Sequence, residues 1–213
     1  MIAMDMLIAN FILLFIVVDP IGVAAVFTGL SAGMARAAQR RAAVQGALVA
    51  LGILLLFFLA GEQLLGWLGI GIPAFRVAGG ILLFLLAIDM VLVRDSALRT
   101  ATDSERDEAA SRNDISVFPL AFPLLAGPGA LTTVLLMASH GHSLGDHLAQ
   151  AGVVVVVLLL ALLALLAAPG LTRVLGATGV NVVNRVLGLI LAALAAQYIL
   201  DGLVAVFPGI SGA

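Results

Sequence analysis

A carboxylate and a proline stand side by side in an apolar run near the start of the chain, in the segment Asp19-Pro20-Ile21-Gly22. Proline removes a helical hydrogen bond and clashes with the preceding turn, but it is favoured at the first position of a helix, with Asp as the cap before it. We therefore predict a helix broken here, whose second half begins at Pro20. A charge inside a membrane costs roughly 2.5–3.5 kcal/mol on insertion scales, so Asp19 is expected to have a function, with a pure helix cap as the alternative.

A second break of the same kind is predicted at Gly127-Pro128-Gly129, in a run that also contains Pro119 and Pro123. The N-terminus of each half-helix carries about half a positive charge and several unpaired N–H groups, which attract anions. Asp19 adds one carboxylate that can hold an ammonium group or a proton. This combination suits a small zwitterion, whereas a purely structural kink at Pro128 is the alternative.

The residues predicted to bind substrate lie at the two breaks, in the turns that follow the second break, and at one deep amide. They are Asp19, Pro20, Gly22, Gly127, Pro128, Gly129, Thr132, Thr133 and Gln197. Arg76 and Arg185 lie one turn inside two other apolar runs, where an arginine either extends to the lipid headgroups or forms a gating ion pair. We assign both, together with Asp19, to gating or coupling.

The elements that position these residues must be helices in a lipid bilayer. Of the 213 residues, 63% are hydrophobic and 10% are charged, and the mean hydropathy is +1.24, so a soluble fold of this size could not bury the apolar side chains. Continuous apolar runs predict an all-α, polytopic membrane protein with six transmembrane helices and exclude a barrel. The runs are 4–30, 44–66, 73–93, 115–138, 149–168 and 184–207. Asn181 and Asn184 are expected to cap the last run.

The charges in the connections predict how the helices are oriented. Arginines follow the first and third runs and lie between the fifth and sixth, whereas the other connections and both ends of the chain contain no Lys or Arg. The positive-inside rule places the arginine-bearing loops in the cytoplasm and both termini outside. The chain then divides into helices 1–3 (residues 1–95), a cytoplasmic linker of mixed charge (96–114) and helices 4–6 (115–213).

An internal repeat relates these two halves. A shift of 108 residues brings Pro20 onto Pro128, and a shift of 109 brings Arg76-Val77-Ala78-Gly79 onto Arg185-Val186-Leu187-Gly188. Because each half contains three spans, the second half enters the membrane from the opposite side. This arrangement predicts two inverted three-helix repeats, broken at Pro20 and Pro128, around a site near the midplane of the membrane.

Several classes of function are disfavoured by what the sequence lacks. Cysteine is absent, and the ten cationic residues are all arginine with no basic patch interleaved with aromatics, so disulfides and nucleic-acid binding are not expected. No catalytic or nucleotide-binding motif is present, and we expect neither an enzyme nor a cofactor. His140, His142 and His147 have a spacing that binds metal only weakly, and no metal site is predicted.

Several segments resemble the MarC family, and the resemblance covers essentially the whole chain. They are Asp19 to Gly22, Pro73 to Gly80, Ala87 to Met90, Phe118 to Gly129 and Asn184 to Leu189. The resemblance implies an inner-membrane protein of a bacterium or archaeon, grouped with the LysE-type exporters, whose fold has three plus three inverted spans. Related members are described as transporters of small neutral amino acids such as alanine and glycine. Family members commonly carry Asn and Pro after the first motif, where this chain has Val23, Ala24 and Ala25.

We therefore expect a secondary transporter, an exporter or exchanger of small neutral amino acids. Alternating access would take place around the two breaks, coupled to H⁺ through Asp19 or to Na⁺ through unwound carbonyl groups. A homo-oligomer is compatible with the sequence. Two alternatives stay open: a non-transporting scaffold or lipid-binding membrane protein, and a metal-ion exporter, for which one deep carboxylate makes a poor site.

Overall fold

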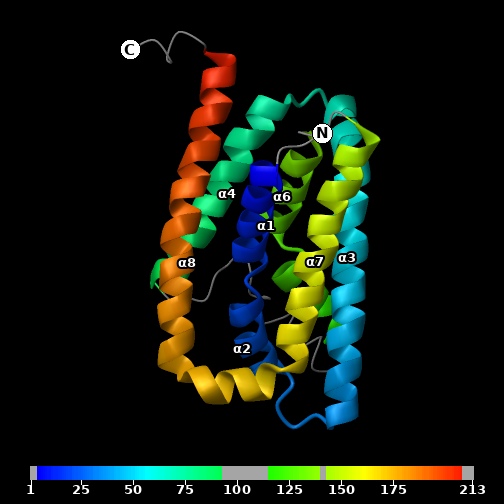
Figure 1. The fold of residues 1–213 in the computed structure, drawn as a ribbon, viewed down its shortest axis with the longest axis vertical. Coiled ribbons are helices and arrows are strands. Elements are labelled where there is room, and N and C mark those ends of the chain that lie inside the picture. Colours follow the sequence, from blue (N-terminus) through cyan, green and yellow to red (C-terminus); the bar gives the residue numbers. More distant parts are fainter. Residues whose placement is uncertain (1–3, 93–114, 140–142, 208–213) are drawn as a thin grey trace.

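A computed structural model describes residues 4–92, 115–139 and 143–207, and these residues form helices with no strand among them (Figure 1). The elements in chain order are α1 (Met4–Val18), α2 (Pro20–Leu30), α3 (Arg36–Trp67), α4 (Ile72–Leu92), η1 (Ser116–Leu125), α6 (Pro128–Ser139), α7 (Leu144–Leu166) and α8 (Ala168–Val206). The predicted linker 96–114 lies outside the described residues.

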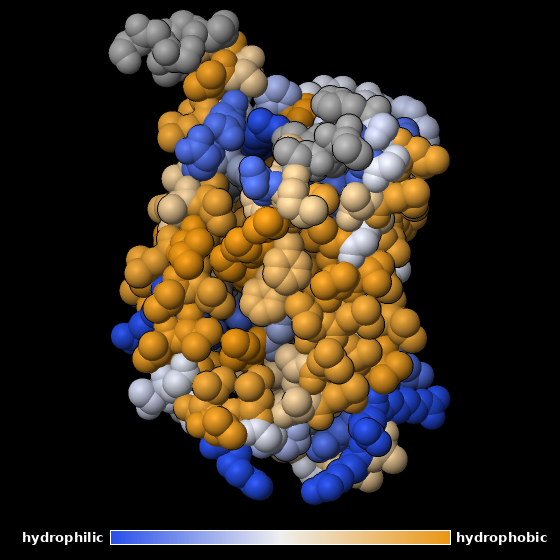
Figure 2. Space-filling model, viewed as in Figure 1, coloured by the Kyte–Doolittle hydropathy of each residue, from blue (hydrophilic) through white to orange (hydrophobic). Residues whose placement is uncertain are grey.

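The helices have the length and composition of membrane spans. Five stretches qualify as single spans, with α1 and α2 together forming one of 27 residues, and η1 with α6 forms a sixth that bends by 59°. On the face drawn in Figure 2, apolar side chains cover most of the middle, and hydrophilic residues gather mainly towards the two ends. The prediction of an all-α, polytopic membrane protein is confirmed.

Three helices begin at least five residues before the predicted runs. α7 begins at Leu144, whereas the predicted run begins at residue 149. α3 begins at Arg36 and so includes its three arginines, well before residue 44. α8 begins with a short stretch that crosses the end of the bundle and turns at Gly176, where φ is 61° (Figure 1). The last span therefore runs from Thr178 to Val206. The prediction that Asn181 and Asn184 cap this span is wrong, because the positive φ of Gly176 starts the span earlier and leaves both residues inside it.

α4 and α8 run antiparallel and pack closely through glycines (Figure 1). A Cβ atom at Gly80 would lie 2.9 Å from the carbonyl oxygen of Ala195, and one at Gly188 would lie 2.9 Å from the Cβ of Met90. If the two halves are related by the shift of 109 residues, the contact of Gly188 with Met90 corresponds to a contact of Gly79 with Ile199. In the structure the side chain of Ile199 is a close neighbour of Gly80, one residue further along α4. The contacts between these helices thus agree with a two-fold relation between them to within one residue.

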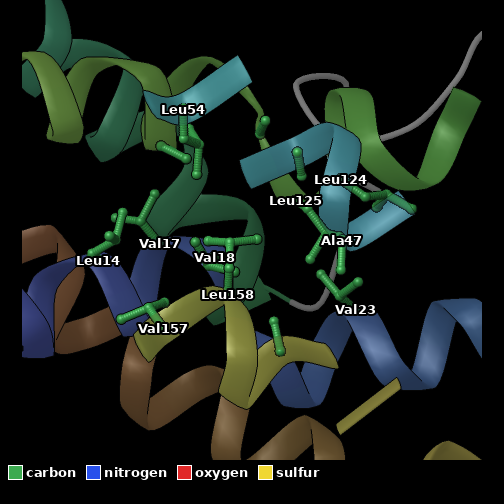
Figure 3. Close-up of a cluster of buried hydrophobic side chains, with 14 of the residues drawn as sticks. Leu14, Val17, Val18, Val23, Ala47, Leu54, Leu124, Leu125, Val157 and Leu158 are labelled. Carbon is green, nitrogen blue, oxygen red and sulfur yellow. The ribbon is translucent and has the colours of Figure 1, made fainter. Parts of the chain in front are cut away.

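The packing of the two broken spans corresponds in the same way. α2 packs against α7 and α8, and α6 packs against α3 and α4, which are the partners that two inverted repeats would give. The core surrounds the two breaks and draws side chains from α1, α2, α3, η1 and α7 (Figure 3). It includes Leu14, Val17, Val18, Val23, Ala47, Leu54, Leu124, Leu125, Val157 and Leu158.

The start of α3 and the first turns of α8 lie at one end of the bundle, opposite to the start of α1 and the end of α8 (Figure 1). Arg36, Arg40, Arg41 and Arg173 are exposed there. This separation agrees with the charge asymmetry of the sequence, and the assignment of the arginine-bearing end to the cytoplasm stays a prediction.

Candidate functional site

The first break is centred on Asp19, which is 1% exposed. Its backbone is left-handed, with φ 50° and ψ 67°, and its carboxylate Oδ1 accepts a hydrogen bond of 3.1 Å from the N–H of Gly22. Left-handed backbone is uncommon for a residue other than glycine, although Asp and Asn adopt it more readily than most. Asp19 therefore both interrupts the first span and caps its second half, as the Asp-Pro pair predicts.

The absence of a side chain at Gly22 makes this cap fit, because a Cβ atom there would overlap the Asp19 carboxylate. The cap also changes the preceding turn. Pro20 has no N–H, and the N–H of Gly22 goes to the Asp19 side chain, so the carbonyls of Ile16 and Val18 lose the donors that a continuous helix would supply. Carbonyl groups released in this way are typical cation ligands in transporters with discontinuous helices.

The second break lies between η1 and α6. η1 is irregular: Phe118 and Phe122, each followed by a proline, are extended, as residues before proline prefer, and hydrogen bonds such as Ala126 N–H to Ala121 O span five residues. α6 then begins at Pro128 as predicted. A Cβ atom at Gly127 would overlap the Pro123 carbonyl oxygen, so this close approach requires glycine.

The two breaks meet inside the bundle. A Cβ atom built on Gly129 would lie 3.2 Å from Cγ1 of Val17, which precedes Asp19 by two residues. A cavity of about 10 Å³ opens between them, lined by Val17, the segment 127–130 at the start of α6, and neighbouring apolar side chains. This space holds about one water molecule. An amino acid is larger, so its binding here requires the breaks to move apart.

The two threonines after Pro128 are buried but face different neighbours. The Thr132 hydroxyl donates to the Pro128 carbonyl and the Thr133 hydroxyl to the Gly129 carbonyl, both at 2.9 Å. The Thr132 methyl group packs against Gly79 of α4, where a Cβ atom would overlap it. In this conformation both hydroxyl protons are used within α6. Gly129 and Ala130 in the first turn of α6 line the small cavity, and the N–H groups of a first turn have no partner within the helix.

The other predicted residues lie away from the breaks. Gln197 is exposed on α8, and its amide donates to the Asp201 carboxylate at 2.7 Å. Arg76 is half-buried near the start of α4, where its charge acts on Tyr198 of α8. Arg185 is exposed on α8. None of the three lines the cavity between the breaks.

Sequence reasoning missed a buried polar pair in the other half of the first span. Asn10 of α1 donates to the side-chain oxygen of Gln150 of α7 at 3.0 Å; Asn10 is 7% exposed and Gln150 is 0% exposed. The side-chain nitrogen of Gln150 is buried with no hydrogen-bond partner. Each of these amides stands in one of the predicted apolar runs, and this position was the sign from which the sequence could have indicated them. Asp146, one turn earlier in α7, is a second buried carboxylate.

Metal-ligating side chains do not gather in the described part of the chain, where no three His, Asp or Glu side chains form a cluster. His147 instead packs edge-on against Phe58, with ring centres 6.1 Å apart. His140 and His142, whose spacing with His147 would bind metal only weakly, lie outside the described residues.

Comparison with known proteins finds relatives that match this chain over most of its length. The sequence model of the MarC family of integral membrane proteins matches residues 4–207. The chain is 36% identical over 203 residues to the UPF0056 membrane protein YhcE of Escherichia coli, covering 94% of this chain and 93% of that protein. A UPF0056 membrane protein of Aquifex aeolicus is 34% identical over 91% of this chain and 90% of its own length. A UPF0056 membrane protein from the archaeon Methanocaldococcus jannaschii is 34% identical over 89% of this chain and 92% of its own length. No solved structure matches the chain.

Proposed function

The chain belongs to the MarC family of integral membrane proteins, and we propose that it is a secondary transporter, not an enzyme, that exports or exchanges small neutral amino acids such as alanine and glycine. The observation that carries the proposal is the contact between Val17 and Gly129 of the two broken membrane helices, with a buried carboxylate, Asp19, two residues along the chain from Val17. Broken helices that meet inside the membrane are typical of substrate sites in transporters built from inverted repeats.

The chemistry of the breaks supports a zwitterionic substrate. The amides of Gly129 and Ala130 at the start of α6 are suited to a carboxylate, because the helix N-terminus offers both N–H donors and a positive partial charge. Asp19 is suited to an ammonium group, or to a proton when the ammonium group is absent. Glycines and alanines at both breaks leave room for a small side chain only.

Coupling to an ion gradient has two candidate sites at the same break. Protonation of Asp19 would couple transport to H⁺, whereas the carbonyls of Ile16 and Val18 would couple it to Na⁺. In either case the small cavity implies a closed conformation, and substrate enters when one repeat moves relative to the other and separates Val17 from Gly129.

Exchange of labelled alanine or glycine in liposomes that contain the purified protein tests this function. We expect saturable exchange that other small neutral amino acids inhibit and that Asp19→Asn abolishes. Gln197→Asn serves as a matched control, because it changes an exposed amide on α8. Folded protein that exchanges no member of a broad amino-acid panel would refute the proposal and favour a scaffold or lipid-binding role. Flux of a divalent metal ion under the same conditions would favour a metal-ion exporter.

A further inference from the structure

A large cavity opens at the arginine-bearing end of the bundle, separate from the small one between the breaks. Its volume is about 1040 Å³, and it lies between the end of α2, the start of α3 and the turn from α7 into α8. Figure 1 shows where these segments lie. Pockets that bury a drug-sized molecule have volumes of about 300–1,000 Å³. This space therefore exceeds what a small amino acid needs for binding, and its size suits a solvent-filled entrance.

The lining of the cavity is polar on the side of α2 and α3. Thr28 of α2, Ser31 at the C-cap of α2 and Gln39 of α3 line it, and the Gln39 amide donates to the Ser31 carbonyl at 2.9 Å. Arg36 and Arg40 also line it, and both are exposed. No carboxylate is among the described residues that line the cavity, so its mouth favours anionic groups.

One face of α2 leads from this cavity to the first break. Ser31, Phe27, Ala24 and Pro20 follow each other at intervals of three or four residues, so they lie along one side of the helix. The cavity reaches Phe27, which is 3% exposed, and the next residue on that face, Ala24, is 0% exposed. Phe27 is thus the last side chain that the cavity touches before the buried stretch that ends at Asp19.

We propose that this cavity is the cytoplasmic vestibule of the transport path, that Arg36 and Arg40 attract the carboxylate of the substrate at its mouth, and that Phe27 is the inner gate that closes it from the Asp19 break. This inference rests on the proposed function for the identity of the substrate. The vestibule and its gate are properties of water access, and labelling detects them without any flux measurement.

The chain contains no cysteine, so single cysteines introduced along α2 report water access without background. Membrane vesicles of known orientation are treated with a membrane-impermeant, anionic methanethiosulfonate. We expect labelling of Thr28→Cys from the arginine-bearing side and none from the other side. Ala24→Cys and Val23→Cys should be protected, and combining either with Phe27→Ala should expose it. Phe27→Leu, a milder change, should produce a smaller gain.

Phe11→Ala is the matched control, because it truncates an aromatic ring of the same span that stacks on Phe15, with ring centres 5.9 Å apart, in the other half. It should leave Ala24→Cys protected. Arg40→Gln should slow the labelling of Thr28→Cys about threefold, since one charge at the mouth acts across solvent. Denaturation followed by labelling confirms that each cysteine is reactive.

Each outcome bears on a different statement. If Thr28→Cys in folded protein is not labelled, the cavity is filled by lipid and the vestibule is refuted. If Ala24→Cys is labelled equally with and without Phe27, Phe27 is not the gate. If Arg40→Gln does not change the rate, the arginines do not attract anions into the cavity. The full labelling pattern without amino-acid exchange would support the vestibule and refute the proposed substrate instead.

Discussion

The capping of α2 by Asp19 predicts an order of stability among substitutions at this position. Asp19→Asn keeps an oxygen that accepts from Gly22 N–H and keeps a residue type that tolerates left-handed backbone, so we expect a change within about 0.5 kcal/mol. Asp19→Ala loses the cap, which is worth about 0.5–2 kcal/mol, and leaves the steric cost of a Cβ atom in left-handed backbone, about 1–2 kcal/mol, without the local hydrogen bond by which Asp offsets it. Together these give a loss of about 1.5–4 kcal/mol. Asp19→Gly relaxes the backbone but loses the cap, and should fall between the two.

Thermal unfolding in one detergent, followed by circular dichroism at a fixed scan rate, measures this order. For a chain of this length 1 kcal/mol corresponds to about 2–4 °C, so Asp19→Ala should unfold roughly 3–16 °C below the original protein. Asp19→Asn should unfold close to it. If Asp19→Ala unfolds at the temperature of the original protein, the side-chain cap and the left-handed backbone do not contribute, and the reasoning is refuted. If Asn is as unstable as Ala, the charge itself stabilises the break.

Three further predictions concern packing and the residues away from the breaks. Asn10→Leu should lower the free energy of unfolding by about 1–3 kcal/mol, because it leaves Gln150 buried without its partner. Adding Gln150→Met should restore stability, and a double variant no more stable than Asn10→Leu alone would contradict this. Gly79→Ala should cost about 1–3 kcal/mol by overlap with the Thr132 methyl group, and Thr132→Ser, which removes that methyl group and keeps the hydroxyl, should recover most of the loss in unfolding measurements. Gln197→Leu should leave amino-acid exchange unchanged, since Gln197 is exposed on α8; a loss of exchange in folded protein would place it on the substrate path.

Both helix breaks were predictable because the rules that produce them are local. A proline at the first helical position, an Asp cap before Pro20 and a glycine before Pro128 act within one turn, and the structure starts α2 and α6 at these two prolines. The irregular course of η1 depends on how Pro119 and Pro123 act together. The sequence indicated an interruption there without its form.

The direction in which a polar side chain points, towards the core or towards the lipid, was harder to predict. In a soluble protein the spacing of apolar residues shows which face of a helix is buried. In this chain lipid-facing and core-facing positions are equally apolar, so a single amide in an apolar run does not show its direction. Gln197 was therefore predicted to reach the site although it lies on the outer face, and the buried pair of Asn10 and Gln150 was passed over.

The two broken spans are unequal, and this asymmetry has a consequence for the opposite state of the cycle. The two halves of the first span bend by no more than 40° at Asp19, whereas the second span bends by 59°. If the two repeats exchange conformations during the proposed alternating access, the bend moves to the first span and the second straightens. The entrance would then close between α2, α3 and α7 at the arginine-bearing end. An equivalent opening would form at the other end, between the end of α6, the end of α3 and the start of α7. The present conformation thus predicts the opposite one, in which each repeat takes the shape that the other has here.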